Sequence, residues 1–327
     1  MFASEWNELT ARQFVGIVNL LHLRDLSSKY DFRNRVVAVM LGDKNIVKKL
    51  IKASYLVELA TEKNKKLAMI QAKDAAACQL VQLWRLFEWV EEDILLTKNL
   101  LPRLRVGFFG GYLYGPGDGL ANMTAMEWTW VDSFYMAYRA DGKLEDLLGM
   151  VACMYRPRIA RGAEKRADWD GDLRVGFNST FVDKRVDLLM RLFVYKKGAL
   201  RLFVEGLMRF FGRGPLNDGR QKGLNRLFVD LFKWLPGEVE LLAVFHWYES
   251  CRHDVELRHP RVFSADNEQK AESFGWQEVF LKISKEGVFG SFAAVSDEAI
   301  DTILLHMEIG MKDEAERERK RVKELKS

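Results

Sequence analysis

The sequence predicts an all-α fold, in which helical hairpins form two similar halves and a further helical region follows them. Three observations favour this class. The 327 residues include only six prolines, which leaves room for long uninterrupted helices. Apolar residues recur at helical spacing along most of the chain, whereas strand-like alternation is confined to residues 104–109 and 173–177. Because 48% of the residues are hydrophobic, such helices can bury a substantial core.

The first half begins with a helix whose N-terminus is marked in the sequence. Thr10 is followed three residues later by Gln13, the capping-box spacing at which each side chain satisfies the other residue's backbone amide. This spacing predicts a helix over residues 10–23. After a polar turn, the apolar pattern predicts a short helix over residues 33–41 and a longer one over residues 75–90.

A glycine-rich segment follows, with six glycines between residues 107 and 119. Because glycine adopts turn conformations freely, this composition stops a helix and predicts a linker over residues 107–121. A phosphate-binding loop is the alternative interpretation. The segment lacks a Gly-Lys-Ser/Thr ending and a Gly-x-Gly-x-x-Gly pattern after a strand, so the sequence disfavours nucleotide binding.

The second half repeats the order of the first at a shift of 114 residues. Without a gap, this shift superposes residues 9–17 on 123–131 and residues 37–40 on 151–154. Thr124 and Glu127 repeat the capping-box spacing. Two amphipathic helices can coincide in a few letters by chance, but the agreement of cap and spacing favours an internal duplication. The predicted halves are residues 1–106 and 122–213.

Helices are predicted in the second half over residues 124–138, 144–155 and 182–211. A C-terminal helical region, residues 214–311, contains further helical patterns over residues 224–235, 238–252, 274–285 and 297–311. Residues 312–327 form a charged helical tail, because Glu and Lys or Arg recur there at the four-residue spacing that stabilises an exposed helix. We expect this tail to protrude toward a partner.

No catalytic, cofactor-binding or metal-binding residues are expected from the sequence. His246, His253 and His259 lie near Cys251, but on one helix Cys251 falls about 140° away from His246, so the four side chains do not converge. A calcium-binding loop starting at Asp168 would need Gly at position 173 and Glu at position 179, where the chain has Leu173 and Ser179. The chain is expected to be non-enzymatic, and an enzyme whose site converges from distant segments is a third interpretation.

The charge distribution allows a nucleic-acid-binding alternative. The net charge is only +4, but residues 156–233 carry eighteen basic and nine acidic side chains. Basic and aromatic residues interleave there, and the candidate phosphate contacts are Arg185, Arg191, Lys196, Lys197 and Arg201. The arginines do not all share one helix face, and the phenylalanines between them are better explained as core.

The aromatic residues of the predicted helix 124–138 are the candidates for binding a partner protein. They are Trp128, Trp130, Tyr135 and Tyr138. Together with Phe134 they occupy nearly every angle of the helix, so they cannot all point into the core of one half. The alternative, which we favour, is that they pack between the two halves.

Two motifs carry a resemblance to a known group of proteins. The first runs from Asn122-Met-Thr124 and Glu127-Trp128 through residues 144–155 to Arg156-Pro157; the second is Gly275-Trp276 with the apolar residues after it and residues 300–307. They resemble uncharacterised proteins of tailed bacteriophages and prophages, several of which are considered tail-assembly chaperones or structural components. The resemblance covers about a third of the chain. It implies a non-enzymatic helical protein whose partners are other phage or prophage structural proteins.

The sequence also bears on the compartment. Three cysteines, far apart and odd in number, are typical of a reducing environment. The first residues do not form a secretory signal, and no apolar stretch approaches the roughly 20 residues that span a membrane. We expect the protein in the cytoplasm of a host cell or in the virion, with no membrane partner; the sequence leaves its oligomeric state open.

Overall fold

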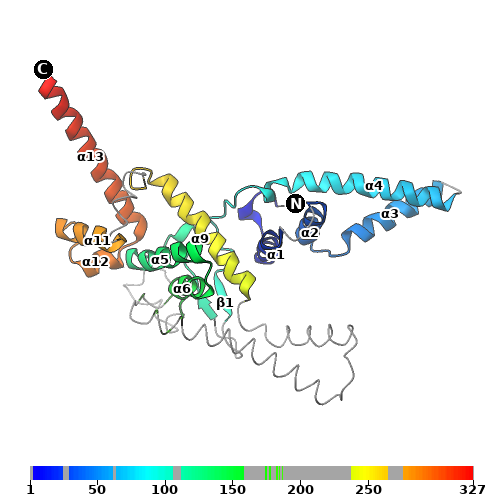
Figure 1. Ribbon diagram of the computed structural model, residues 1–327, viewed down its shortest axis with the longest axis horizontal. Helices are drawn as coiled ribbons and strands as arrows, with labels where there is room; N and C mark the ends of the chain where they lie inside the picture. The colour runs from blue at the N-terminus through cyan, green and yellow to red at the C-terminus, as the bar shows by residue number, and fades with distance from the viewer. Residues whose placement is uncertain are drawn as a thin grey trace, which may run out of the picture. The chain divides into compact units, whose positions relative to one another are not determined.

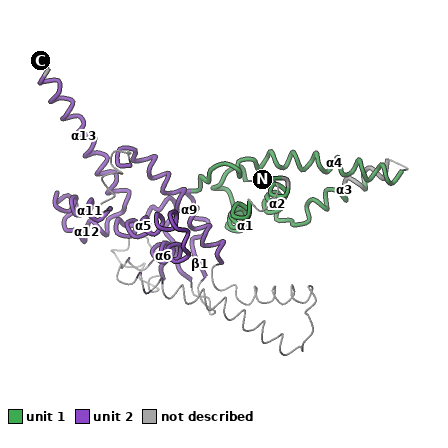
Figure 2. Tube along the Cα trace, in the orientation of Figure 1, with its two compact units in different colours: residues 1–96 green, residues 97–327 purple. Residues whose placement is uncertain are grey.

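The computed structural model describes residues 3–24, 29–61, 64–105, 112–157, 237–263 and 275–326, together with residues 174, 177, 182, 184 and 186. The described chain is mainly helical and contains one sheet of two strands, which confirms the all-α class (Figure 1). It forms two compact units, residues 1–96 and 97–327 (Figure 2).

The first unit contains η1 (Trp6–Glu8), α1 (Ala11–His22), α2 (Lys29–Met40), α3 (Ile46–Thr61), α4 (Lys65–Leu86) and η3 (Glu88–Glu91). The predicted cap of the first helix is confirmed. The Thr10 hydroxyl accepts a bond from the Gln13 amide at 3.3 Å, and the Gln13 side chain accepts one from the Thr10 amide at 3.0 Å. The Gln13 side chain also donates to the Met40 carbonyl, so the cap ties α1 to the end of α2.

Helices α3 and α4 form a long antiparallel hairpin (Figure 1). Helix α3 was not predicted, and α4 begins ten residues before the predicted helix 75–90. Asn64 explains that start, because its side chain accepts bonds from two backbone amides of the first turn. The buried face of α4 consists of Ala68, Ala72, Ala76 and Leu80. Such small side chains, four residues apart, let the two helices approach closely.

The second unit contains β1 (Arg103–Arg105), β2 (Tyr112–Tyr114), η4 (Asp118–Leu120), α5 (Ala125–Asp141), α6 (Leu144–Met154), α9 (Glu238–Arg258), α11 (Gly275–Glu286), α12 (Phe292–Asp297) and α13 (Ile300–Lys326). Strand β1 falls within the predicted strand 104–109 except for its first residue, whereas β2 was not predicted. The strands pair antiparallel, with Leu104 opposite Leu113. The other strand candidate, residues 173–177, lies mostly outside the described residues.

The described part of the glycine-rich segment belongs to the second unit, and the boundary between the units precedes the predicted linker 107–121. Its residues pack closely on the chain before β1. The Gly119 amide donates to the Thr97 carbonyl at 2.7 Å, and the Asn99 side chain donates to the Pro116 carbonyl at 2.6 Å. A Cβ atom on Gly115 would lie 2.7 Å from the Tyr155 ring, so close packing requires glycine there.

Helices α5, α6 and α9 build the core of the second unit. Every residue of α6 from Leu147 to Met154 is buried, as expected for a helix that is apolar on all sides. The charged tail is confirmed as helical, because α13 continues unbroken to Lys326, and all side chains from residue 312 to 325 are exposed. Within the described chain, no helix has the length and apolar character needed to span a membrane. The predicted helix 224–235 lies outside the described residues, as does the predicted helix 182–211 except for residues 182, 184 and 186. The division into two similar halves stays a prediction.

Candidate functional site

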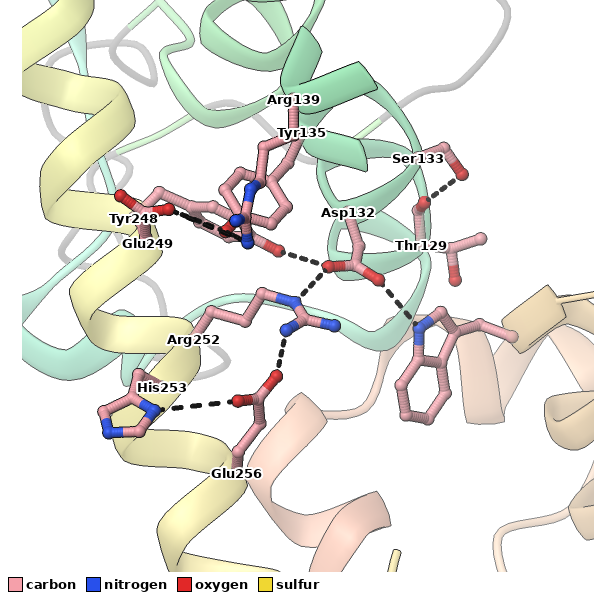
Figure 3. Close-up of polar contacts among 11 residues, drawn as sticks. Thr129, Asp132, Ser133, Tyr135, Arg139, Tyr248, Glu249, Arg252, His253 and Glu256 are labelled. Carbon is pink, nitrogen blue, oxygen red and sulfur yellow. Dashed lines mark hydrogen bonds and ion pairs between the residues drawn. The ribbon is translucent and has the colours of Figure 1, made fainter. Parts of the chain in front are cut away.

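A network of polar side chains joins α5, α9 and α11 in the second unit (Figure 3). Its centre is Asp132 on α5, whose side chain is 10% exposed. The carboxylate accepts hydrogen bonds from Arg252 Nε at 2.7 Å, from the Tyr248 hydroxyl at 3.3 Å and from Trp276 Nε1 at 3.3 Å. Arg252 also pairs with Glu256 one turn further along α9. One carboxylate therefore holds donors from two other helices.

A second part of the network lies one turn further along α5. The Tyr135 hydroxyl donates to Glu249 at 3.1 Å and accepts a bond from Arg139 at 3.2 Å. The other Glu249 oxygen lies 3.3 Å from His246 Nδ1. Tyr135, Arg139, His246 and Glu249 therefore form a chain of polar contacts that links α5 to α9.

Two buried side chains of α9, Tyr248 and Cys251, hold their protons tightly. Burial raises the pKa of Tyr248 well above its ordinary value, and the neighbouring Asp132 carboxylate raises it further. Burial also raises the pKa of Cys251. Because both groups hold their protons at neutral pH, neither supplies a phenolate or a thiolate. The arrangement is suited to fixing helices.

Glu249 is expected to make stability depend on pH. The bond with His246 is the main cause that lowers the pKa of Glu249 below its ordinary value of 4.5, against burial, which raises it. A carboxyl group whose pKa is lower in the folded than in the unfolded state stabilises the fold at pH values above its unfolded-state pKa. That contribution is lost as the pH falls through the folded-state pKa. Between pH 6 and pH 3, the free energy of unfolding in urea is therefore expected to fall more steeply for the wild type than for Glu249→Gln. Parallel curves for the two proteins would contradict this expectation.

A buried charge cluster lies at the N-terminal end of α5. Glu127 accepts bonds from Arg156 at 2.8 Å and from Arg174 at 2.6 Å, and all three side chains are buried. Arg174 also donates to the carbonyls of Asn122 and Met154. The second predicted capping box is therefore half wrong. Thr124 accepts the bond from the Glu127 amide, but the Glu127 side chain binds arginines instead of returning a bond.

The structure places the four aromatic candidates of α5 in two environments. Trp128 and Tyr135 are buried, with ring contacts from Trp128 to Tyr248 and Trp276 and from Tyr135 to Phe245. Trp130 and Tyr138 are partly exposed. Among the described residues, the aromatic rings that contact Trp128 and Tyr135 belong to α9 and α11, in the predicted C-terminal region. The packing of these side chains between the predicted halves stays a prediction.

The histidines of α9 and of its C-cap lie beside different carboxylates. His246 is close to Glu249, His253 to Glu256 and His259 to Asp301. Among the described residues, no group of three or more His, Cys, Asp and Glu side chains has the arrangement of a metal site. The Asp168 loop and the nucleic-acid candidates Arg185, Arg191, Lys196, Lys197 and Arg201 lie outside the described residues.

The exposed side of α4, in the first unit, carries an apolar stripe that the sequence analysis missed. We call it the outer stripe and define it as Leu67, Ile70, Asp74, Ala77 and Val81. Leu67, Ile70 and Val81 are 44%, 51% and 39% exposed. At about 100° per residue the stripe lies opposite the buried face that packs on α3. Alternating spacings of three and four are the signal of a helix that packs against another helix.

Comparison of the chain with protein-family models, with curated protein sequences and with solved structures finds no match in any of the three.

Proposed function

We propose that this chain is a non-enzymatic protein-interaction protein that binds other structural proteins of a phage or prophage during assembly, in the host cytoplasm or in the virion. The outer stripe of α4 carries the proposal. It places three large apolar side chains on one exposed face, and exposed apolar side chains gathered on one face are typical of protein-binding sites. The phage context is supported by the resemblance of the two motifs described above.

The polar network of the second unit is consistent with a binding protein. Its ionisable groups are engaged with one another, and Asp132, Tyr248 and Arg252 connect helices that are more than a hundred residues apart in sequence. Such a network gives a rigid frame. An enzyme would need some of these groups to face a substrate.

The double variant Leu67→Ser/Ile70→Ser is expected to lose the partner. Full burial of such a side chain contributes about 1.5–3 kcal/mol, and about half of each one is left for a partner to bury, so the loss of two weakens binding by at least roughly tenfold. The measurement is a pull-down at high salt from a nuclease-treated lysate of the organism that encodes the chain, with the retained proteins identified by mass spectrometry. Phage or prophage structural proteins are expected with the wild type only.

A matched control removes apolar side chains of similar exposure elsewhere. Leu305 and Ile309 on α13 are 53% and 52% exposed, so Leu305→Ser/Ile309→Ser changes the surface without touching the outer stripe. This variant is expected to keep the partner. If the wild type and both variants retain the partner equally, the proposal is contradicted. If nuclease treatment abolishes retention of the partner by the wild type, the result favours the alternative, nucleic-acid binding through residues 156–233.

A further inference from the structure

The hairpin that carries the outer stripe is basic. Helices α3 and α4 together contain seven Lys or Arg residues and two acidic residues. On α4 the cations are Lys65, Lys66, Lys73 and Arg85, and none of the four forms an ion pair with another described residue. By contrast, Arg33 of α2 lies 2.5 Å from Glu91. The positive charge of α4 is therefore not neutralised within the described part of its own unit.

The position of the cations relative to the outer stripe matters for what can bind. Lys66 immediately precedes Leu67 of the outer stripe, and Lys73 immediately precedes Asp74. Because both lysines have the same offset from the stripe, they lie along the same flank of it. Flanking positions of this kind face the flanking charges of a partner helix and select it by charge.

We propose that the outer stripe of α4 binds an amphipathic helix of a partner protein whose apolar face is flanked by acidic side chains. This inference rests on the proposed function and adds the chemistry of the partner. From Leu67 to Val81 the stripe is about 21 Å long at 1.5 Å per residue, which matches a partner helix of about four turns. Acidic side chains on the flank of the partner helix would lie against Lys66 and Lys73.

Asp74 makes the surface selective. It is an exposed carboxylate in the middle of the outer stripe, and a partner helix that covers it must offer a hydrogen-bond donor or a cation at the facing position. A purely apolar helix would leave the Asp74 carboxylate buried without a partner. The partner is therefore acidic on its flank and carries one basic or amide side chain within its apolar face.

Other occupants fit the surface less well. A second copy that used the same stripe would bring Lys66 and Lys73 against the same lysines and so repel itself. An anionic bilayer would satisfy the lysines but would have to accept the Asp74 carboxylate between two apolar turns. A nucleic acid would satisfy the lysines and leave Leu67 and Ile70 unused.

Cys78 allows the occupant to be identified directly in the full chain. It is exposed on α4, one residue after Ala77 of the outer stripe, whereas Cys153 and Cys251 are buried. A thiol-directed benzophenone on Cys78 is irradiated in the native lysate, and the segment joined to it is sequenced by mass spectrometry. The expected adduct is an amphipathic segment of another protein with acidic flanks. An adduct with a neutral or basic segment, a lipid, a nucleic acid or the same chain overturns the inference.

Charge reversal then tests the contact with the synthetic peptide of the segment found. Lys66→Glu/Lys73→Glu is expected to raise the Kd of that peptide by roughly tenfold, and a peptide with its acidic flank changed to lysine is expected to restore binding to this variant. Lys320→Glu/Lys323→Glu on α13 is the control with an unchanged Kd. If Lys66→Glu/Lys73→Glu keeps the partner that Leu67→Ser/Ile70→Ser loses, this inference fails while the proposed function stands. The absence of any protein adduct contradicts both.

Discussion

Glu127→Gln is expected to lower the free energy of unfolding of the second unit by about 3–5 kcal/mol, the range for removing one partner of a buried ion pair. Glu127 has no exposed surface, and the Arg156 and Arg174 side chains that it holds are 2% and 1% exposed. Glutamine keeps the shape of the side chain but not its charge. The variant therefore leaves two guanidinium cations buried without the carboxylate that they share. Urea unfolding followed by circular dichroism measures the loss.

Glu314→Gln is the matched control for this change. Glu314 lies in the exposed part of α13, so the same substitution is expected to alter the free energy of unfolding by no more than about 0.5 kcal/mol. A loss below about 1 kcal/mol for Glu127→Gln would mean that other groups neutralise the two arginines. A loss in the expected range would identify Glu127 as the residue that fixes the start of α5 to the chain after α6.

Local signals in the sequence were sufficient to locate several helix starts. The Thr10 box was predicted because both of its members lie within one turn, and the bond from the Gln13 side chain to the Met40 carbonyl leaves its oxygen free to accept from the Thr10 amide. At Thr124 the same pattern failed for Glu127, because Arg156 and Arg174 compete for its carboxylate from 29 and 47 residues downstream. In a buried site a charge-assisted bond to arginine outweighs a bond to one backbone amide.

The parts of the fold that were missed have weak local signals. The buried face of α4 is mostly alanine, so a search for large apolar residues detects that helix only from residue 75 onward. Strand β2 lies among glycines that favour a turn, and only its pairing with β1 makes it a strand.

The candidate sites show the same limit. The rings that contact Trp128 and Tyr135 belong to residues of α9 and α11 more than a hundred positions further along the chain, where no local pattern could indicate them. The 3–4 spacing of the outer stripe was present in the sequence. It could not be recognised as a surface feature, because both faces of α4 are apolar and only the packing on α3 decides which one is buried.

Asp132→Ala is expected to lower the free energy of unfolding by about 2–3 kcal/mol. The substitution removes the acceptor of Arg252, Tyr248 and Trp276 together, and each buried donor left without a partner costs about 1–3 kcal/mol. The expected loss is smaller than for Glu127→Gln, because Arg252 is 18% exposed and retains Glu256. Tyr248 is fully buried, so its hydroxyl has no solvent to replace the lost acceptor.

A double-mutant cycle separates the ion pair from the rest of this loss. Asp132→Ala, Arg252→Met and the double variant are expected to give a coupling energy of about 1–3 kcal/mol, since the double variant removes the charge that each single variant leaves unpaired. The exposed pair Asp31 and Arg35 on α2, one turn apart, is the control, with an expected coupling of about 0.3–0.5 kcal/mol. If the losses at Asp132 and Arg252 simply add, the two residues act independently. The bonds from Tyr248 and Trp276 would then be what holds α5 to α9 and α11.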